Sequence, residues 1–118
     1  MPRLLTDPTR IPVPGGKRID ELVGLASSGD GAVSVAHMEA PAGWTEPFQT
    51  PEFLEVTIVV RGLVTVECEG VIHECQAGEV IVTDPGERIR YGVGPEGAAY
   101  YAICLPAFSP ERVHRDEA

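Results

Sequence analysis

The chain has no long apolar run. No segment approaches the roughly 18 apolar residues of a membrane span, and its first residues, MPRLLTDPTRIPVPGG, hold no apolar stretch of the length that a secretion signal needs. Basic residues are also scarce, with nine Lys and Arg against eighteen Asp and Glu. The resulting net charge of −9 repels phosphate backbones and anionic membrane surfaces. These absences predict a cytoplasmic protein that binds neither nucleic acid nor membrane.

Cysteine is rare, and two familiar catalytic motifs are missing. The three cysteines, Cys68, Cys75 and Cys104, are an odd number. In a hairpin that turns at residues 69–70, Cys68 and Cys75 are not cross-strand partners, so we predict reduced thiols that act as small hydrophobic side chains. The sequence contains neither a phosphate-binding loop nor a nucleophile elbow. Cys104 lies in the apolar stretch YYAICL, which indicates an inert buried thiol.

Glycine and proline, in contrast, are plentiful. Thirteen Gly and eleven Pro show no repeat period, while 43% of the residues are hydrophobic. This balance is typical of short strands joined by tight turns. A chain of 118 residues is long enough to bury a substantial core and too short for two domains of ordinary size.

Short strand-like segments recur along the chain and are separated by turn signals such as Glu69-Gly70 and Asp84-Pro85-Gly86. The expected strands cover residues 32–40, 53–60, 63–68, 71–75, 79–83, 89–91 and 98–105. Strands at about ten-residue spacing are typical of an antiparallel sandwich or barrel. We therefore predict an all-β fold.

The residues before these strands are harder to interpret. Residues 1–16 carry four prolines and predict an extended arm that packs on the barrel or on a partner subunit. In residues 16–26 the apolar side chains Ile19, Leu22 and Val23 follow helical spacing and favour a short helix, with a strand as the alternative. In residues 32–40 we expect Val33, Val35 and His37 to share one face.

One strand is apolar on both of its faces. The run Val56-Thr57-Ile58-Val59-Val60 has no polar alternation, which indicates that one face packs toward the inside of a barrel and the other against a further layer. In so small a chain that layer is expected to be a second subunit. We therefore predict a homodimer.

Two stretches carry the skeleton of a known pair of motifs. The first motif is a Gly, five residues, His-x-His, three or four residues, Glu, six residues and Gly. Gly43, Glu55 and Gly62 stand at these spacings, but Gln49 and Pro51 occupy the two His positions. One motif carboxylate and one amide remain where the pattern has three ligands.

The second motif is a Gly, five residues, Pro-x-Gly and a later His. Gly78 and Gly86 match it, Asp84 replaces the first Pro with Pro85 beside it, and Ile89 stands at the His position. Over roughly residues 30–106 the chain therefore resembles the cupin superfamily of RmlC-like barrels, with degenerate metal motifs. It is most similar to small single-domain bacterial cupins of uncharacterised function that share the stretch Gln-Thr-Pro-Glu-Phe.

The resemblance implies a cupin-type double-stranded β-helix, or jelly-roll barrel, with a short N-terminal arm or helix. It implies a single cupin domain over residues 1–118, comprising an N-terminal arm at 1–29, the barrel core at 30–106 and a charged tail at 107–118. In the tail we expect a solvated His114, the alternative being that the tail folds over a barrel mouth and delivers His114 to the pocket.

Candidate site residues follow from the motif strand. Glu55 should point into the lumen with Thr57 and Val59, while Ile89 and Tyr91 should face it from the second motif. Glu52 precedes Glu55 by three residues, and a pair of close carboxylates would raise the pKa of one of them. The alternatives are that Glu52 is solvated or pairs with an arginine, and that Glu55 hydrogen-bonds Gln49, Tyr91 or water in a polar pocket. The candidate pocket residues are His37, Trp44, Gln49, Glu52, Glu55, Tyr91 and Tyr101.

The sequence is compatible with three functions. The first is a barrel that binds a small polar or carboxylated molecule, as a binding module or an enzyme, with no metal or a weakly bound divalent metal. The second is a divalent-metal enzyme using Glu55, Gln49 and a histidine from outside the motif, His37 being the best placed. The third is a non-catalytic dimeric interaction protein with a filled barrel. The fold alone does not choose between enzyme and binding module.

Overall fold

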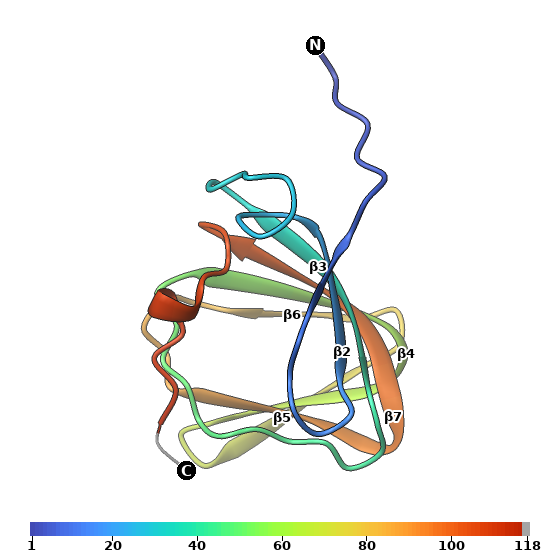
Figure 1. Ribbon diagram of the computed structural model, residues 1–118. Helices are drawn as coiled ribbons and strands as arrows, with labels where there is room; N and C mark the ends of the chain where they lie inside the picture. The colour runs from blue at the N-terminus through green and yellow to red at the C-terminus, as the bar shows by residue number, and fades with distance from the viewer. Residues whose placement is uncertain (117–118) are drawn as a thin grey trace.

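Two long strands, β4 (Leu54–Cys68) and β7 (Ile89–Leu105), organise the structure, a computed structural model that describes residues 1–116 (Figure 1). They pair antiparallel along almost their whole length. The shorter elements are β1 (Thr9–Ile11), β2 (Arg18–Val23), β3 (Ser34–Ala40), β5 (Val71–Gln76), β6 (Val80–Thr83) and the single 3-10 turn η1 (Pro110–Arg112). The all-β prediction is confirmed.

Both long strands bend and so belong to two facing sheets. Residues 54–62 of β4 pair with residues 98–105 of β7, and residues 64–68 pair with residues 89–93. The first half continues to β3, β2 and β1 on one side and to β6 on the other, whereas the second half continues to β5. Figure 1 shows these two halves facing each other. This is the predicted jelly-roll barrel.

The bend depends on a close approach of two backbones. Register shifts lie on either side of Arg61-Gly62 in β4. Gly62 has φ +80°, and a Cβ at this position would lie 2.1 Å from the carbonyl oxygen of Gly97. Only glycine fits, because any side chain would overlap the opposite strand. The motif glycine therefore shapes the barrel rather than its chemistry.

Side chains alternate across the sheets as the two-residue period requires. In β4 the side chains of Glu55, Thr57 and Val59 are buried, whereas Ile58 and Val60 are exposed, which confirms the predicted inward face. Val64, Val66, Ile89 and Tyr100 join Val59 in the main apolar cluster. Burying each of the four aliphatic side chains in this set stabilises the fold by roughly 1.5–3 kcal/mol.

The phase of β3 differs from the prediction. Ser34 and Ala36 are buried and face inward, whereas Val35 and His37 are on the outer side of the sheet. The predicted alternation of Val33, Val35 and His37 is correct, but the face that we expected toward the lumen is the outer one. Each face of β3 mixes apolar and polar side chains, Val35 with His37 on one and Ala36 with Ser34 on the other, so the two-residue period does not show which face is inside.

Residues 16–26, for which we favoured a short helix, contribute a strand to a β-hairpin instead. Residues 18–23 form β2, which pairs with β1 from Thr9 opposite Glu21 to Ile11 opposite Ile19. The strand alternative therefore holds and the helix does not. Ahead of β1, residues 1–8 project away from the barrel (Figure 1), where Arg3 pairs with Asp30 at 3.0 Å.

The hairpin between β4 and β5 forms in the predicted register. Cys68 lies opposite Val71 and Cys75 opposite Val64, so the two thiols are not partners. All three cysteines are free, as expected. Among residues 1–116 there is no helix that is both long and apolar enough to cross a membrane.

Candidate functional site

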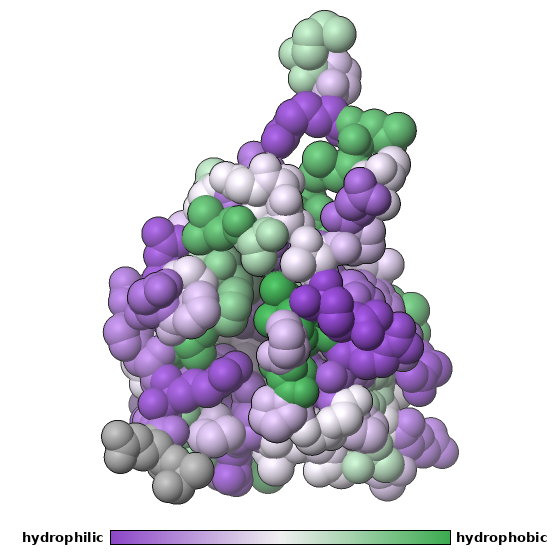
Figure 2. All heavy atoms as spheres, in the orientation of Figure 1, coloured by the Kyte–Doolittle hydropathy of each residue, from purple (hydrophilic) through white to green (hydrophobic). Residues whose placement is uncertain are grey.

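A cavity of about 310 Å³ lies between the sheets and is flanked by two segments, one from each end of the chain. The loop of the β1–β2 hairpin and the tail after η1 both contribute to its lining. In Figure 2 the surface is hollowed between these segments, with hydrophobic residues beside the hollow. The polar side chains that line it include Lys17, Glu46, Gln49, Glu55, Tyr91 and Arg115. The plugged lumen expected of a filled barrel is not what the structure has.

Two buried carboxyls line the cavity. Glu21 accepts hydrogen bonds from the backbone N–H groups of Ala26 and Ser27, and Glu55, with 8% of its surface exposed, lies on β4. Its strand lies between β6 and β7, where its backbone partners are Thr83 and Cys104. Burial raises the pKa of Glu55 to about 7, partly opposed by the positive charge of Lys17 and reinforced by the negative charge of Glu46. Near neutral pH this carboxyl can therefore both accept and donate a proton.

Lys17 lines the same cavity, between the Gly15-Gly16 turn and the start of β2. Its Nζ is 4.0 Å from the centroid of the Trp44 ring and 5.5 Å from that of Tyr100. These aromatic faces position the ammonium group. Burial nevertheless lowers the pKa of Lys17, although the nearby charges of Glu46 and Glu55 oppose the shift.

The tail after η1 folds over the mouth of the barrel. Its backbone pairs with residues 48–52, where Asp116 N donates to Phe48 O and Thr50 N donates to His114 O. Arg115 thereby lines the cavity and lies 3.6 Å from a carboxylate oxygen of Glu46. Burial raises the pKa of Glu46, while Lys17 and Arg115 lower it.

Two neutral groups, Gln49 and Tyr91, are also part of the polar lining. Gln49 is held by reciprocal backbone hydrogen bonds with Ile89, each 2.8 Å, but its side-chain Oε1 is buried and has no partner. Tyr91 shares a 3.0 Å hydrogen bond with Thr83 Oγ1, and burial raises the pKa of its phenol well above the ordinary value. An unpartnered buried oxygen carries a desolvation cost, so a ligand or water that donates to Gln49 gains from it.

The structure brings together part of the predicted set. Gln49, Glu55 and Tyr91 line the cavity, and Trp44 contacts it through Lys17. Glu52 is exposed and its carboxyl contacts the His114 ring by a hydrogen bond, so it is not the second carboxyl near Glu55. Glu46 takes that place.

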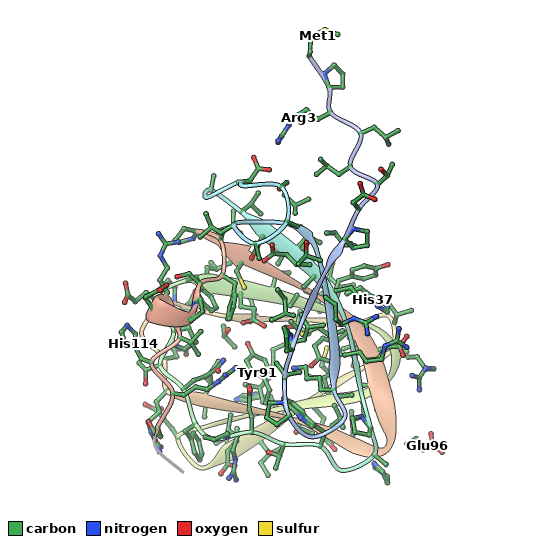
Figure 3. All side chains as sticks on the ribbon, in the orientation of Figure 1. Met1, Arg3, His37, Tyr91, Glu96 and His114 are labelled. Atoms are coloured by element: carbon green, nitrogen blue, oxygen red, sulfur yellow. The ribbon has the colours of Figure 1, made fainter. Side chains whose placement is uncertain are left out.

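His37 and Tyr101 lie outside the lumen. They are backbone partners on β3 and β7, and their rings contact each other edge to face at 5.0 Å on the outer side of the sheet. Figure 3 shows His37 on the outside of the barrel and Tyr91 within it. The expectation that His37 approaches the lumen is wrong because β3 has the opposite phase. The tail does fold over the mouth, but His114 is exposed and Arg115 lines the cavity instead.

The cavity does not supply the donors of a standard cupin metal site. Ile89, in the third ligand slot, is fully buried hydrocarbon, and His37 is on the far side of the sheet. In residues 1–116 no three His, Cys, Asp or Glu side chains come together as a metal site. Glu55 and Gln49 remain, next to the cation of Lys17, which repels a second cation. The predicted donor set of Glu55, Gln49 and His37 is not assembled.

Among the lining residues that the sequence does not reveal are Lys17, Glu46 and Arg115. Their positions depend on a hairpin loop and a tail whose paths have no periodic signal. One signal was available for Lys17. It is the only lysine in the chain, because the other eight of the nine basic residues are arginines.

Comparison with known proteins decides the family. A model of the AraC-like ligand-binding domain matches residues 33–117, which is most of the chain. The chain belongs to this family. Three solved structures show the same cupin fold. An RmlC-like cupin of Shewanella frigidimarina is 19% identical, with a TM-score of 0.72 and 85% of each chain covered.

The other two structures come from Streptomyces. PAC13 with uridine is 16% identical, with a TM-score of 0.79 over 99% of this chain and 92% of its own. The polyketide cyclase RemF of Streptomyces resistomycificus is 20% identical, with a TM-score of 0.75 over 100% of this chain and 87% of its own. At these identities the likeness shows the fold alone.

A curated relative is more similar in sequence. The protein called endoribonuclease YbeY in Myxococcus xanthus is 46% identical over 107 residues, which is 90% of this chain. The match covers only 36% of that relative. The chain thus spans about a third of the length of the curated relative that it matches.

Proposed function

We propose that the barrel lumen binds a small polar or carboxylated molecule and does so without a tightly held metal. The observation that carries the proposal is the cavity of about 310 Å³, in which Lys17, Glu55 and the unpartnered Oε1 of Gln49 converge. Ligand pockets are usually about 300–1,000 Å³ and combine apolar walls with a few placed polar groups. The lumen falls at the small end of that range and has this composition.

The charges favour a ligand with an acidic or strongly polar group. Lys17 is in none of the ion pairs found among residues 1–116, so its ammonium has no direct carboxylate partner. A ligand carboxylate would supply one as a charge-assisted hydrogen bond. Gln49 Oε1 would accept from a hydroxyl or amide of the same ligand. Apolar lining from Phe53, Ala102 and Phe108 would hold its hydrocarbon part.

The comparisons support binding without naming the ligand. The family is named for ligand binding, and one structural neighbour was solved with uridine. The Myxococcus relative is called an endoribonuclease, but the net charge of −9 of this chain repels an RNA backbone. A small molecule suits the lumen better than a polynucleotide.

A thermal-shift screen tests the proposal. The purified protein is heated with a panel of small carboxylic acids, amides and polyols, and compounds that raise the melting temperature are measured by calorimetry. A ligand at one hundred times its dissociation constant adds roughly 2.7 kcal/mol to the free energy of unfolding. Loss of one charge-assisted bond of about 1.5–3 kcal/mol in Lys17→Gln should weaken a carboxylate at least tenfold.

The matched control is Glu74→Gln, an exposed substitution on β5 that should leave affinity unchanged. Equal binding to the Lys17→Gln and wild-type proteins would place the ligand outside the lumen and contradict the proposal. So would a panel in which no compound stabilises the protein.

A further inference from the structure

The sequence has a single lysine, Lys17, and its side chain lines the cavity. The remaining basic residues are arginines, whose guanidinium groups stay protonated and are poor nucleophiles. The amine in the lumen therefore differs chemically from every basic group on the surface of the described chain.

The surroundings of Lys17 keep its amine in place and available. The rings of Trp44 and Tyr100 hold Nζ at 4.0 and 5.5 Å, and no carboxylate pairs with it directly in the described residues. Glu46, Glu55 and Arg115 are the charged groups that act on it. Burial lowers the pKa of Lys17, which increases the fraction of neutral amine at a given pH. Desolvation of this kind is a recognised way to activate a lysine.

We propose that Lys17 captures a small carbonyl compound as an imine inside the lumen, with Glu55 as the group that relays the proton. The inference rests on the proposed small-molecule function and names the class of ligand: an aldehyde or a 2-oxo acid that fits a cavity of about 310 Å³. A carboxylate on the ligand would lie near Arg115 at the mouth. The carbonyl carbon would then face Nζ.

The reaction balances without a further reactant. A water molecule in the lumen carries a proton from the Lys17 ammonium to the Glu55 carboxylate, since the two groups are not in direct contact, and the free amine attacks the carbonyl carbon. The C–N bond forms, the C=O π pair moves to oxygen, and a proton passes from nitrogen to that oxygen to give a neutral carbinolamine. Protonated Glu55 gives its proton to the hydroxyl, which leaves as water while the nitrogen lone pair forms the C=N bond. The net change is ammonium plus carbonyl compound to iminium plus water.

Reductive trapping with an internal comparator tests the inference. Arg61 is exposed and in none of the described ion pairs, so Arg61→Lys adds one solvent-facing lysine to a protein whose lumen is intact. This protein is incubated with pyruvate and sodium cyanoborohydride at neutral pH. Peptide mass spectrometry after cleavage at acidic residues then measures labelling at positions 17 and 61. We expect labelling at Lys17 at least tenfold faster than at position 61.

A second variant tests the proton relay. In Glu55→Gln, made in the Arg61→Lys background, labelling at Lys17 should fall several-fold while labelling at position 61 stays the same. Circular dichroism confirms that the variant is folded. Labelling at Lys17 no faster than at the surface lysine would overturn the imine, and an unchanged rate in Glu55→Gln would overturn the relay. If the screened ligands still bind while Lys17 stays unreactive, the proposed function stands and only this inference fails.

Discussion

At the scale of single residues, Glu55 shows what a motif position can and cannot reveal. Its place on the inner face of β4 follows from the strand period, and the structure confirms it. Its chemistry depends on Lys17 and Glu46, which come from segments 38 and 9 residues away in sequence. No local sequence pattern predicts that these residues come together, because the hairpin loop and the strand meet only in the folded barrel.

Glu55 should make stability depend on pH in a way that glutamine removes. Its pKa is raised in the fold from 4.5 to about 7, so the folded state binds this proton more tightly than the unfolded chain does. The stabilisation is fully present below the unfolded pKa and is lost as pH rises through the folded pKa. The loss amounts to roughly 3 kcal/mol. Between pH 4.5 and 8, the free energy of unfolding of Glu55→Gln, measured in urea, should therefore rise relative to that of the wild type.

The exposed substitution Glu74→Gln is the control for that comparison. It should keep the pH dependence of the wild type, since all other carboxyls are shared. If the free energies of Glu55→Gln and the wild type differ by the same amount at both ends of the pH range, then Glu55 does not have a raised pKa in the fold.

At the scale of elements, turns and glycines were the reliable signals. The hairpin at Glu69-Gly70 forms in the expected register, and the β4–β7 barrel contains every strand expected after residue 53. Two predictions were wrong. Helical spacing favoured a helix where β2 lies, and in β3 the face expected to point inward points outward. In both cases the sheet has apolar residues on both faces, so the periodic signal is weak or symmetric.

The bend of β4 provides a prediction at this scale. Gly62 and Gly70 have nearly the same backbone, with φ +80° and +77°, but only Gly62 has a backbone atom against it. Gly70→Ala should destabilise the protein by about 1 kcal/mol through strain alone. Gly62→Ala should cost several times more, because its Cβ would overlap Gly97 O and force the strands apart. Urea unfolding of the two variants measures the difference, and equal costs would contradict this account of the bend.

At the scale of the whole molecule, the outer face of the sheet that contains β6 is apolar where β6, β4 and β7 lie side by side. Cross-strand rows join Val82 to Val56 and Ile103, and Val80 to Ile58 and Tyr101. Val80 and Val82 are 54% and 52% exposed, and among the described strands β6 pairs only with β4, which leaves one edge open. A two-fold axis beside β6 would cover this surface in both copies. We therefore expect a homodimer through this face.

Light scattering coupled to size exclusion tests the dimer. The wild type should elute with twice the monomer mass of 12.6 kDa. Val80→Glu places a charge in the expected interface and should give monomers. Val71→Glu is the matched control, since Val71 is also 54% exposed but lies on β5 of the other sheet. A wild type that is monomeric, or a Val80→Glu variant that stays dimeric, would contradict this interface.

Because the sequence has a single lysine, one measurement tests directly whether the lumen around Lys17 binds a ligand. Protein labelled with ¹³C-lysine has one side-chain Cε signal, which reports on Lys17 alone. We expect this signal to titrate with a pKa below 10.5 and to shift when a compound from the thermal screen is added. A signal that titrates like that of an exposed lysine and does not respond to any stabilising compound would show that Lys17 does not form part of a ligand-binding lumen.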